Sequence, residues 1–597
     1  MSTESDAVDD RSAIDDAYTW DLSAIYADES DWEAACERAE ELIDDVADYE
    51  GRLTDDPETL AAGLRVRDEL SRVIESIYAY ARLHHDEDTR DDERQALLSR
   101  ARSLATRARS ASSYVEPAIQ AADVDVATAI EAEPELAVYD HYIDDVRRLA
   151  DHTRSSEVEE LLADLSEVTS AGGDVYDRLA NADMTFPSVD RPDGTEAEVT
   201  LNSFTSLLKH PDRAFRREVY ETFYDEWESV RNAVATTYEK SLLADVTLAR
   251  AREYESAHEA ALDDPNVPVA VYETLVETVR ERLPTLHRHV ELKRRVVDDE
   301  VRMWDLYRPL VDDDPIVEYD RATEYVVDAL SVLGEDYERR VREAIDSRWI
   351  DVYETPGKSA GGYSLGVYDA HPYILLNWQD DVTSMFTLAH ELGHTVHSDY
   401  TNENQPHVYS SYEIFVAEVA STVNEALLAR HLIETVDDEA FRRAVVNEYV
   451  ERFRSTLFRQ TKFAEFEATT HDLVEDDEPI TAGRLDDLYR DLQADYYEPA
   501  VVDDRIVREW MRIPHFYSAF YVYQYATGIS AAVALAEDIR SEGEPAAERY
   551  REFLRQGGHG YPLDLLADAG VDMRSPEPIE RAIDVYGGFL DELADLL

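Results

Sequence analysis

The sequence has few lysines, a single cysteine and no long apolar run. Only five of its 597 residues are lysine, and the one cysteine is Cys36. A lone cysteine excludes an internal disulfide framework, and Cys36 lies in an acidic helical segment without a nearby histidine, which predicts a structural role. No segment has the about 18 uncharged apolar residues of a membrane helix, and the N-terminus MSTESDAVDD lacks the basic and apolar regions of a signal peptide. These absences predict a cytoplasmic protein with no membrane partner.

Positive charge is also scarce. The chain has 58 Lys and Arg against 132 Asp and Glu, a formal net charge of −74. Nucleic acids bind basic surfaces, and no cluster of arginines interleaved with aromatics is present, so nucleic acid is not an expected partner. The charge destabilises a compact chain in dilute buffer, whereas at 1 M salt the Debye length falls to about 3 Å and the repulsion is largely screened. The composition therefore predicts a halophilic source with a salt-rich cytoplasm.

Helical periodicity dominates the first 350 residues, and hydrophobic residues make up 44% of the chain, which excludes a disordered polypeptide. We therefore expect a mostly α fold. The turn-rich stretch PSVDRPDGT at 187–195 predicts a boundary between an N-terminal helical domain, residues 1–195, and a second domain, residues 196–597. One stretch departs from helical periodicity: GGYSLGVYDAHPYILLNW at 361–378 predicts a small β-hairpin. Such a strand can bind an extended peptide by strand addition, or it can merely close one end of a core.

The hairpin precedes an apolar helix, predicted to start at residue 382 after an aspartate N-cap at 380 or 381, that carries the motif H-E-x-x-H. His390 and His394 are four residues apart, so both imidazoles lie on one face and can reach a single zinc ion. Glu391 lies beside them, where it can hold a water molecule on that ion. Two hydrogen-bonded core histidines are the structural alternative. Gly393 favours the metal site, because a glycine in mid-helix indicates close approach by a ligand or another backbone.

A catalytic zinc needs a third protein ligand. His397 is too far away, since it lies about 10 Å along the helix axis from His390. Glu418 is favoured, because a carboxylate in the apolar stretch FVAEVAS is costly to bury without a cation. Glu413 is the competitor, although the helix dipole also explains a glutamate in a first turn. Glu425 continues the same polar face and is placed to hydrogen-bond one of the histidines.

Several stretches resemble the oligoendopeptidase F branch of the thimet-type zinc metallopeptidases. They are HELGH (390–394), FVAEVASTVNE (415–425), TWDLSAIY (19–26), GKSAGGYS (357–364), PYILLNW (372–378) and HFYSAFYVYQYATG (515–528), and together they extend over nearly the whole chain. The resemblance implies a two-lobed helical fold with a deep channel that excludes folded proteins and admits oligopeptides. It also implies one zinc ion held by His390, His394 and Glu418, with Glu391 as the catalytic base.

The resemblance further implies that Tyr523 and His515 hydrogen-bond the oxyanion of the reacting peptide. From pattern alone, an aromatic stripe of this kind is more often part of a helical core than of a catalytic site. The residues expected to contact the substrate are Gly361, Gly362, Tyr363 and Tyr517.

The predicted function is a zinc-dependent endopeptidase that hydrolyses oligopeptides in peptide catabolism. One alternative function is that of a related metallocarboxypeptidase. Such an enzyme would need a fixed cationic group for the terminal carboxylate, and the sequence identifies none. A non-catalytic, peptide-binding relative also stays open, although it would have no need to keep Glu391 beside a metal.

Overall fold

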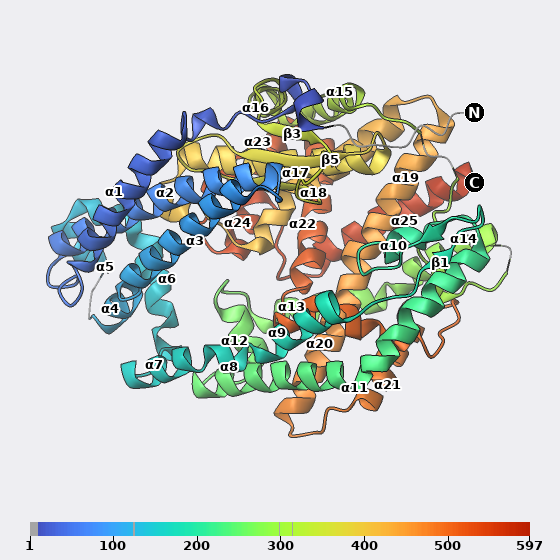
Figure 1. The fold of residues 1–597 in the computed structure, drawn as a ribbon, viewed down its shortest axis with the longest axis horizontal. Coiled ribbons are helices and arrows are strands. Elements are labelled where there is room, and N and C mark those ends of the chain that lie inside the picture. The colour runs from blue at the N-terminus through green and yellow to red at the C-terminus, as the bar shows by residue number, and fades with distance from the viewer. Residues whose placement is uncertain (1–9, 123–125, 298, 313–314) are drawn as a thin grey trace. The chain divides into compact units, whose positions relative to one another are not determined.

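The computed structural model describes residues 10–122, 126–297, 299–312 and 315–597, and these residues are mostly helical (Figure 1). The expectation of a mostly α fold is confirmed. The chain forms two compact units, and each is assembled from three separate segments. Unit 1 comprises Met1–Asp151, Ile316–Leu432 and Leu535–Val571, and unit 2 comprises His152–Pro315, Ile433–Ala534 and Asp572–Leu597. The domain boundary after residue 195 stays a prediction, and residues 1–9 of the expected first domain lie outside the described residues.

Helices occupy most of the described chain. In chain order they are α1 (Glu29–Ala47), α2 (Pro57–Glu87), α3 (Asp92–Ser112), α4 (Val115–Ala121), α5 (Val126–Ala132), α6 (Asp140–Arg148), α7 (Ser156–Asp164), α8 (Ser166–Thr169), α9 (Ala171–Arg178), α10 (Phe204–Leu207), α11 (Arg213–Ala251), α12 (Ala257–Asp263), α13 (Val269–Glu281), α14 (Leu283–Val297), α15 (Tyr319–Leu330), α16 (Glu335–Asp346), α17 (Val382–Asn404), α18 (Ile414–Thr435), α19 (Glu439–Phe453), α20 (Arg459–Glu475), α21 (Ala482–Tyr496), α22 (Tyr523–Glu542), α23 (Glu544–Gln556), α24 (Pro562–Ala569) and α25 (Glu577–Leu596). None of the helices in the described ranges combines the length and the apolar character needed to cross a membrane.

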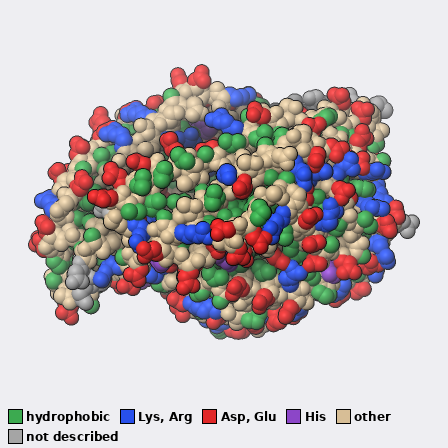
Figure 2. All heavy atoms as spheres, turned by 90° about the horizontal axis from the view of Figure 1, so that it is seen from below, with side chains coloured by type: hydrophobic (Ala, Val, Ile, Leu, Met, Phe, Trp, Pro, Cys, Tyr) green, Lys and Arg blue, Asp and Glu red, His purple; other side chains and the backbone are tan. Residues whose placement is uncertain are grey.

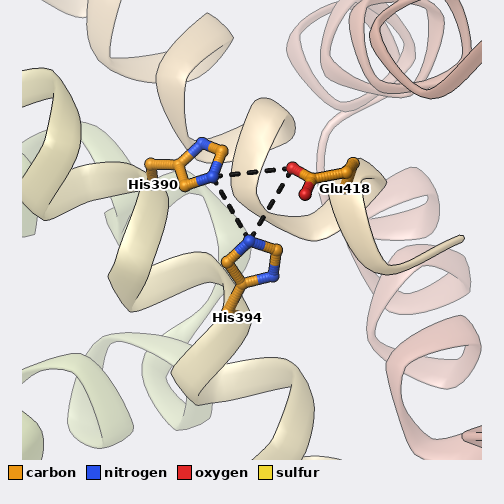
Figure 3. A group of neighbouring side chains, drawn as sticks. All are labelled: His390, His394 and Glu418. Atoms are coloured by element: carbon orange, nitrogen blue, oxygen red, sulfur yellow. Dashed lines mark hydrogen bonds and ion pairs between the residues drawn. The ribbon is translucent and has the colours of Figure 1, made fainter. Parts of the chain in front are cut away.

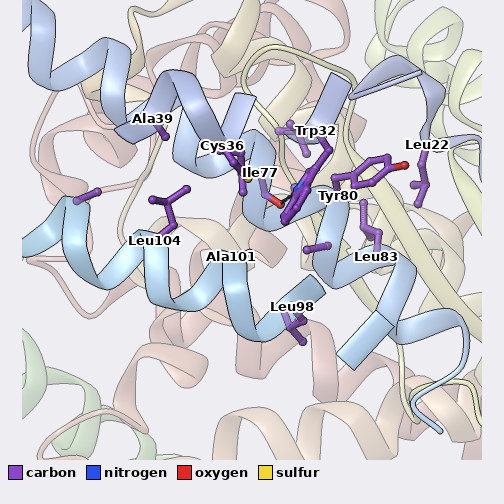
Figure 4. Close-up of a cluster of buried hydrophobic side chains, with 14 of the residues drawn as sticks. Leu22, Trp32, Cys36, Ala39, Ile77, Tyr80, Leu83, Leu98, Ala101 and Leu104 are labelled. Atoms are coloured by element: carbon purple, nitrogen blue, oxygen red, sulfur yellow. Dashed lines mark hydrogen bonds between the residues drawn. The ribbon is translucent and has the colours of Figure 1, made fainter. Parts of the chain in front are cut away.

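The first three helices of unit 1 pack together around an apolar cluster (Figure 4). Trp32 of α1 is fully buried there, and its indole N–H donates to the carbonyl oxygen of Ile77 at 3.0 Å. Cys36 lies in the same cluster, and burial raises the pKa of its thiol to about 11. A buried thiol with a raised pKa is unreactive, so Cys36 acts as a small apolar residue.

Part of the acidic excess caps helices. Six aspartates each precede a helix and accept hydrogen bonds from its first backbone N–H groups, and a cap of this kind contributes about 1 kcal/mol. They are Asp28, Asp56, Asp91, Asp212, Asp381 and Asp438. Asp381 caps α17, so the helix begins where the sequence predicts.

Acidic and basic side chains are interspersed over the face drawn in Figure 2. Lysine contributes little to the surface, because the side chains of Lys293, Lys358 and Lys462 are buried and each is ion-paired with a carboxylate. Only Lys209 and Lys240 are exposed. The exposed cations of the described chain are therefore almost all arginines.

A three-stranded sheet in unit 1 precedes the helix that carries H-E-x-x-H. Its order is β3 (Ile350–Tyr353), β5 (Tyr373–Trp378), β4 (Tyr363–Leu365); β5 is parallel to β3 and antiparallel to β4. The predicted hairpin is therefore confirmed as β4 and β5. The strand β4 lies at the edge of the sheet, and α17 packs against both β4 and β5.

The turn-rich stretch at 187–195 forms a small ribbon in unit 2. There β1 (Val189–Asp190) pairs antiparallel with β2 (Glu196–Ala197). The turn between the two strands contains Gly194, whose φ of +86° is the left-handed conformation that favours glycine.

The helices α17 and α18 approach each other closely at Gly393. A Cβ atom at this position would lie 2.5 Å from the Cα of Ser421 and 2.6 Å from the carbonyl oxygen of Ala420. The side chain of Asn424 fastens the same pair of helices, since its Nδ2 donates to the carbonyl oxygen of Ala389 at 3.0 Å. The close approach that Gly393 indicates in the sequence is therefore to another backbone, and it brings the histidine face of α17 against α18.

Candidate metal centre

His390 and His394 of α17 and Glu418 of α18 point toward one another (Figure 3). The two histidine Nε2 atoms are 3.2 Å apart, and Glu418 Oε2 lies 3.5 Å from Nε2 of His390 and 3.7 Å from Nε2 of His394. Zinc ligands in a tetrahedron, with bonds of about 2.1 Å, are about 3.4 Å apart. The three donor atoms therefore have the spacing of one face of a zinc site. No other group of three metal-ligating side chains meets in the described residues.

The donors stay accessible from solution. The side chains of His390, His394 and Glu418 are 26%, 20% and 23% exposed to solvent, respectively. A structural zinc site is closed by four protein ligands, whereas a catalytic site keeps one position open. Three protein donors with partial exposure match the catalytic arrangement.

Hydrogen bonds orient both rings. His390 Nδ1 lies 2.7 Å from Glu425 Oε1, which leaves Nε2 facing the other donors. Although burial opposes the charged form, the bond to Glu425 raises the pKa of His390 to about 9. The ring of His394 hydrogen-bonds to the backbone of Ala417, yet burial and the neighbouring His390 lower the pKa of His394 well below its ordinary value. A neutral imidazole and one made more basic by a carboxylate are the ligand types that zinc prefers.

Glu391 lies next to the donor group without belonging to it. Its side chain is buried and accepts a hydrogen bond from the backbone of Ser364 in β4. Burial, opposed by His390 and reinforced by Glu418 and Glu425, raises the pKa of Glu391 to about 7. A carboxylate with a pKa near neutrality can both accept and return a proton.

The two competing ligands lie outside the donor group. His397 is buried and stacks on Tyr412 with ring centroids 3.8 Å apart, and burial lowers its pKa to about 3. Glu413 directly precedes α18, where its carbonyl oxygen accepts the N–H of Val416 at 3.0 Å. Among the described residues, the donor group contains neither of them.

The residues expected to contact substrate in unit 1 lead into the edge strand β4. A Cβ at Gly362 would lie 3.2 Å from Thr387 and 3.7 Å from Glu391 Oε1, so a side chain here would crowd Thr387 and fill space next to Glu391. The carbonyl oxygen of Gly361 accepts from Asn377 Nδ2 at 2.8 Å. The phenol of Tyr363 donates to Asp86 Oδ2 at 2.7 Å, a partner that the sequence does not reveal.

The remaining predicted site residues belong to unit 2. His515 lies parallel to Tyr521 with ring centroids 5.8 Å apart. The phenol of Tyr517 is hydrogen-bonded to Thr237 Oγ1 at 2.7 Å. Tyr523 is buried at the start of α22. The catalytic and substrate-binding roles of these three residues stay predictions that the resemblance carries.

Comparisons with known proteins show that the chain is similar to peptidases. Residues 206–585 match Peptidase family M3, and residues 119–186 match Oligopeptidase F. The oligopeptidase PepF of Bacillus subtilis is 42% identical over 592 residues, which cover 98% of this chain and 88% of the relative. The group B oligopeptidase PepB of Streptococcus agalactiae is 38% identical and covers 99% of this chain and 98% of its own.

Solved structures of related proteins are also similar to this chain. The crystal structure of oligoendopeptidase-F from Enterococcus faecium is 34% identical, with a TM-score of 0.74 over 95% of this chain and 99% of that one. A structure from Chlamydophila abortus is 30% identical, with a TM-score of 0.89 over 99% of this chain and 100% of that one. The chain belongs to peptidase family M3, in its oligopeptidase F branch, and is a metalloendopeptidase that acts on oligopeptides.

Proposed function

We propose that His390, His394 and Glu418 bind one zinc ion and that Glu391 is the catalytic base of this peptidase. The observation that carries the proposal is the spacing of the three donor atoms, 3.2, 3.5 and 3.7 Å, beside a glutamate outside the donor group. When bound, zinc supplies Lewis acidity and lowers the pKa of water toward 7.

The protein side chains move the protons. Glu391 takes the proton of the attacking water and then donates it to the amine nitrogen of the leaving half of the peptide. Its pKa of about 7 suits both transfers at neutral pH. Glu425 holds His390 in the orientation that presents Nε2 to the metal, at 2.7 Å from Nδ1.

The edge strand β4 is the proposed place for the substrate backbone. An extended peptide can add to a free strand edge through main-chain hydrogen bonds, which give affinity without demanding a particular side chain. Gly361 and Gly362 precede this edge, and the space beside Gly362 lies against Glu391. Binding through the backbone suits an endopeptidase, whereas a carboxypeptidase needs a fixed cation for the terminal carboxylate.

The test uses quenched fluorescent oligopeptides with both termini blocked, combined with measurement of zinc content. We expect one zinc per chain, cleavage inside the blocked peptides, loss of turnover after chelation and recovery on adding zinc. Cleavage of peptides with a free carboxyl terminus only would indicate a carboxypeptidase. A zinc-loaded chain that binds peptides without cleaving them would indicate the non-catalytic alternative.

Tyr523 and His515 are proposed to donate hydrogen bonds to the oxyanion of the reacting carbonyl group. Removing one such donor typically costs about a hundredfold in kcat. We therefore expect Tyr523→Phe to lower kcat by about that factor while KM and zinc content change little. Tyr521→Phe, two residues earlier in the same aromatic stretch, is the matched control. Equal kcat in Tyr523→Phe and the parent enzyme would indicate that Tyr523 only packs in the helical core.

Two further properties are proposed from the charge and the resemblance. A net charge of −74 supports action in a salt-rich cytoplasm. Exclusion of folded proteins is tested by offering a stable folded protein and an oligopeptide copied from its sequence. Cleavage of the oligopeptide alone is the expected result, and cleavage of both at similar rates would contradict exclusion.

A further inference from the structure

A groove of about 1130 Å³ lies within unit 1, outside the donor group. One wall is formed by α2 and α3, and the other includes Ser398 and Asn402 of α17 and the segment that connects α17 to α18. Its lining combines apolar side chains such as Leu70 and Ile74 with hydroxyl groups such as Thr106 and Ser410. A groove of this composition can hold both the backbone and the side chains of an extended peptide.

The groove adjoins the proposed peptidase site. Gly366 directly follows β4, and Ser398 lies one helical turn beyond His394 on α17. Tyr412, two residues before α18 begins, also lines the groove and stacks on His397. A peptide that extends the edge of β4 past Gly366 therefore enters this groove.

The helix α3 carries two Arg-Ala-Arg triplets seven residues apart, at 100–102 and 107–109, and the arginines within each triplet differ in their surroundings. Arg100 and Arg107 are ion-paired with Glu33 and Glu40 of α1. Arg102 and Arg109 instead line the groove on an exposed face of α3.

Arg102 and Arg109 are exceptions among the arginines of this acidic protein. Only four arginine side chains in the described residues have no ion pair, hydrogen bond or aromatic contact, and two of them lie in this groove. The four are Arg102, Arg109, Arg178 and Arg295.

The acids that line the groove are already engaged. Glu75 pairs with His407 at 3.0 Å and accepts the backbone N–H of Tyr368 at 3.1 Å. Glu116 accepts the phenol of Tyr142 at 3.5 Å. Arg102 and Arg109 are therefore available to bind carboxylates that come from outside the chain.

We propose that this groove is a substrate subsite for carboxylates, in which Arg102 and Arg109 bind acidic side chains of an oligopeptide at positions remote from the scissile bond. The inference rests on the proposed function and names the class of peptide that the site prefers. A guanidinium binds a carboxylate through two parallel hydrogen bonds, so the contact gives direction as well as charge.

The spacing of the two arginines sets the spacing of the acids. Seven residues of helix separate Arg102 from Arg109 by about 10 Å along the axis. Beyond β4, a peptide in the polyproline II conformation has three residues per turn and a rise of about 3.1 Å per residue, so residues i and i+3 lie on one face and cover that distance. Substrates with Glu-x-x-Glu along the groove can therefore reach both arginines at once. Adjacent glutamates reach only one.

The experiment compares kcat/KM for blocked fluorescent peptides that differ only in having Glu-x-x-Glu, Glu-Glu or Gln-x-x-Gln at successive distances from one cleavage site. All peptides are measured at the same KCl concentration, the lowest at which the enzyme is active, because salt screens exposed charges. We expect the zinc-loaded enzyme to prefer Glu-x-x-Glu over Gln-x-x-Gln by about three- to tenfold at one distance, on one side of the cleavage site only. In the double variant Arg102→Gln/Arg109→Gln the ratio should fall to about one. The matched control, Arg100→Gln/Arg107→Gln on the same helix, should keep the preference.

Binding is measured separately with the zinc-loaded Glu391→Gln variant and the same peptides carrying a fluorophore. The anisotropy titration should show the same preference for Glu-x-x-Glu and the same loss in the double arginine variant. The subsite is overturned if no distance shows a preference, if adjacent glutamates are preferred equally, or if the control variant loses the preference as fully. Absence of cleavage of every peptide would instead contradict the proposed function, and the anisotropy titration would still decide the subsite.

Discussion

Unit 1 and unit 2 each bury a group of carboxylates, but they neutralise the charge in different ways. In unit 2, Glu509 is 3% exposed and its two oxygens accept hydrogen bonds from three cationic and two neutral side chains. The donors are Lys462 (2.9 Å), Arg459 (2.9 Å), Arg512 (3.0 Å), Tyr489 (2.8 Å) and Gln493 (2.8 Å). Despite burial, these cations hold the pKa of Glu509 well below its ordinary value.

The candidate metal centre of unit 1 groups its carboxylates around histidines. Glu391, Glu418 and Glu425 surround two histidines, and no lysine or arginine is among the main causes of the pKa shifts of His390, His394 or Glu391. As a result the pKa of Glu391 rises to about 7, whereas that of Glu509 falls.

The comparison separates a structural charge from a functional one. Burying an ionised carboxylate costs several kcal/mol unless a cation accompanies it. Around Glu509 the chain supplies the cations, so the network is complete when the protein folds. Around Glu418 the neighbouring side chains are His390 and His394, and in the proposed function a metal ion from solution supplies the positive charge.

The largest expected effect comes from Glu418→Ala, which removes one of three donors and should abolish zinc binding and, with it, turnover. Glu413→Ala is the matched control, since Glu413 lies outside the donor group. Zinc content by atomic absorption after dialysis, measured beside peptide cleavage, checks the prediction. Zinc loss in Glu413→Ala with retention in Glu418→Ala would reverse the assignment of the third ligand.

Glu391→Gln sharpens the contrast within the candidate metal centre, because Glu391 is the proposed base and lies outside the donor group. Turnover should fall by about 10²- to 10⁴-fold, the usual contribution of general acid–base catalysis, while one zinc stays bound. Steady-state cleavage and zinc content are measured on the same sample. Near-parent turnover in a zinc-loaded variant would exclude Glu391 as the base.

Lys462→Met tests whether the ion pairs around Glu509 in unit 2 stabilise the fold. Removing one cation from a buried pair costs about 3–5 kcal/mol of unfolding free energy, because Glu509 keeps its charge in a buried site. Zinc content should not change. Lys240→Met, which breaks an exposed pair with Glu239 at 3.2 Å, is the matched control and should have little effect. Urea unfolding of zinc-loaded proteins measures both, and equal stability of the two variants would contradict a structural role for the network.

The sequence predicts which residues form the donor group better than it predicts the contacts around that group. Glu418 stands out because apolar and small residues flank it within one helix, and Gly393 stands out because glycine is costly in mid-helix. These signals are local. The donor group follows from two helices that are neighbours in the chain, so helical spacing is enough to find it.

Contacts between distant segments could not be found in this way. The strand β3 pairs with β5 across the intervening strand β4, and the burial of its four residues does not alternate. Asp86 of α2 binds the phenol of Tyr363, 277 residues away in the chain. The network of Glu509 likewise joins α20, α21 and the segment after them. Each of these features depends on tertiary packing, which one-dimensional spacing does not encode.

The dependence of stability on salt concentration should differ between buried and exposed charges. For any single ion pair, this is the smallest of the expected effects. Most of the 132 acidic side chains cannot be buried, and their mutual repulsion is long-ranged at 0.01 M salt, where the Debye length is about 30 Å. Folding brings these charges together, so screening by molar salt should raise the melting temperature of the zinc-loaded enzyme. Potassium chloride should serve as well as sodium chloride, because screening depends on ionic strength.

Thermal unfolding at several salt concentrations also distinguishes exposed ion pairs from buried ones. Arg38→Gln breaks an exposed pair with Glu69 at 2.7 Å, and its small penalty should shrink further as salt rises, because water and ions reach the pair. The penalty of Lys462→Met should stay nearly constant from about 0.01 M to about 1 M salt, since Glu509 and Lys462 are shielded from mobile ions by the surrounding protein. Far-ultraviolet dichroism followed through thermal unfolding gives both penalties. A Lys462→Met penalty that falls with salt as fast as that of Arg38→Gln would place the Glu509 network within reach of solvent, and a melting temperature that stays flat would remove salt adaptation as the reason for the acidic surface.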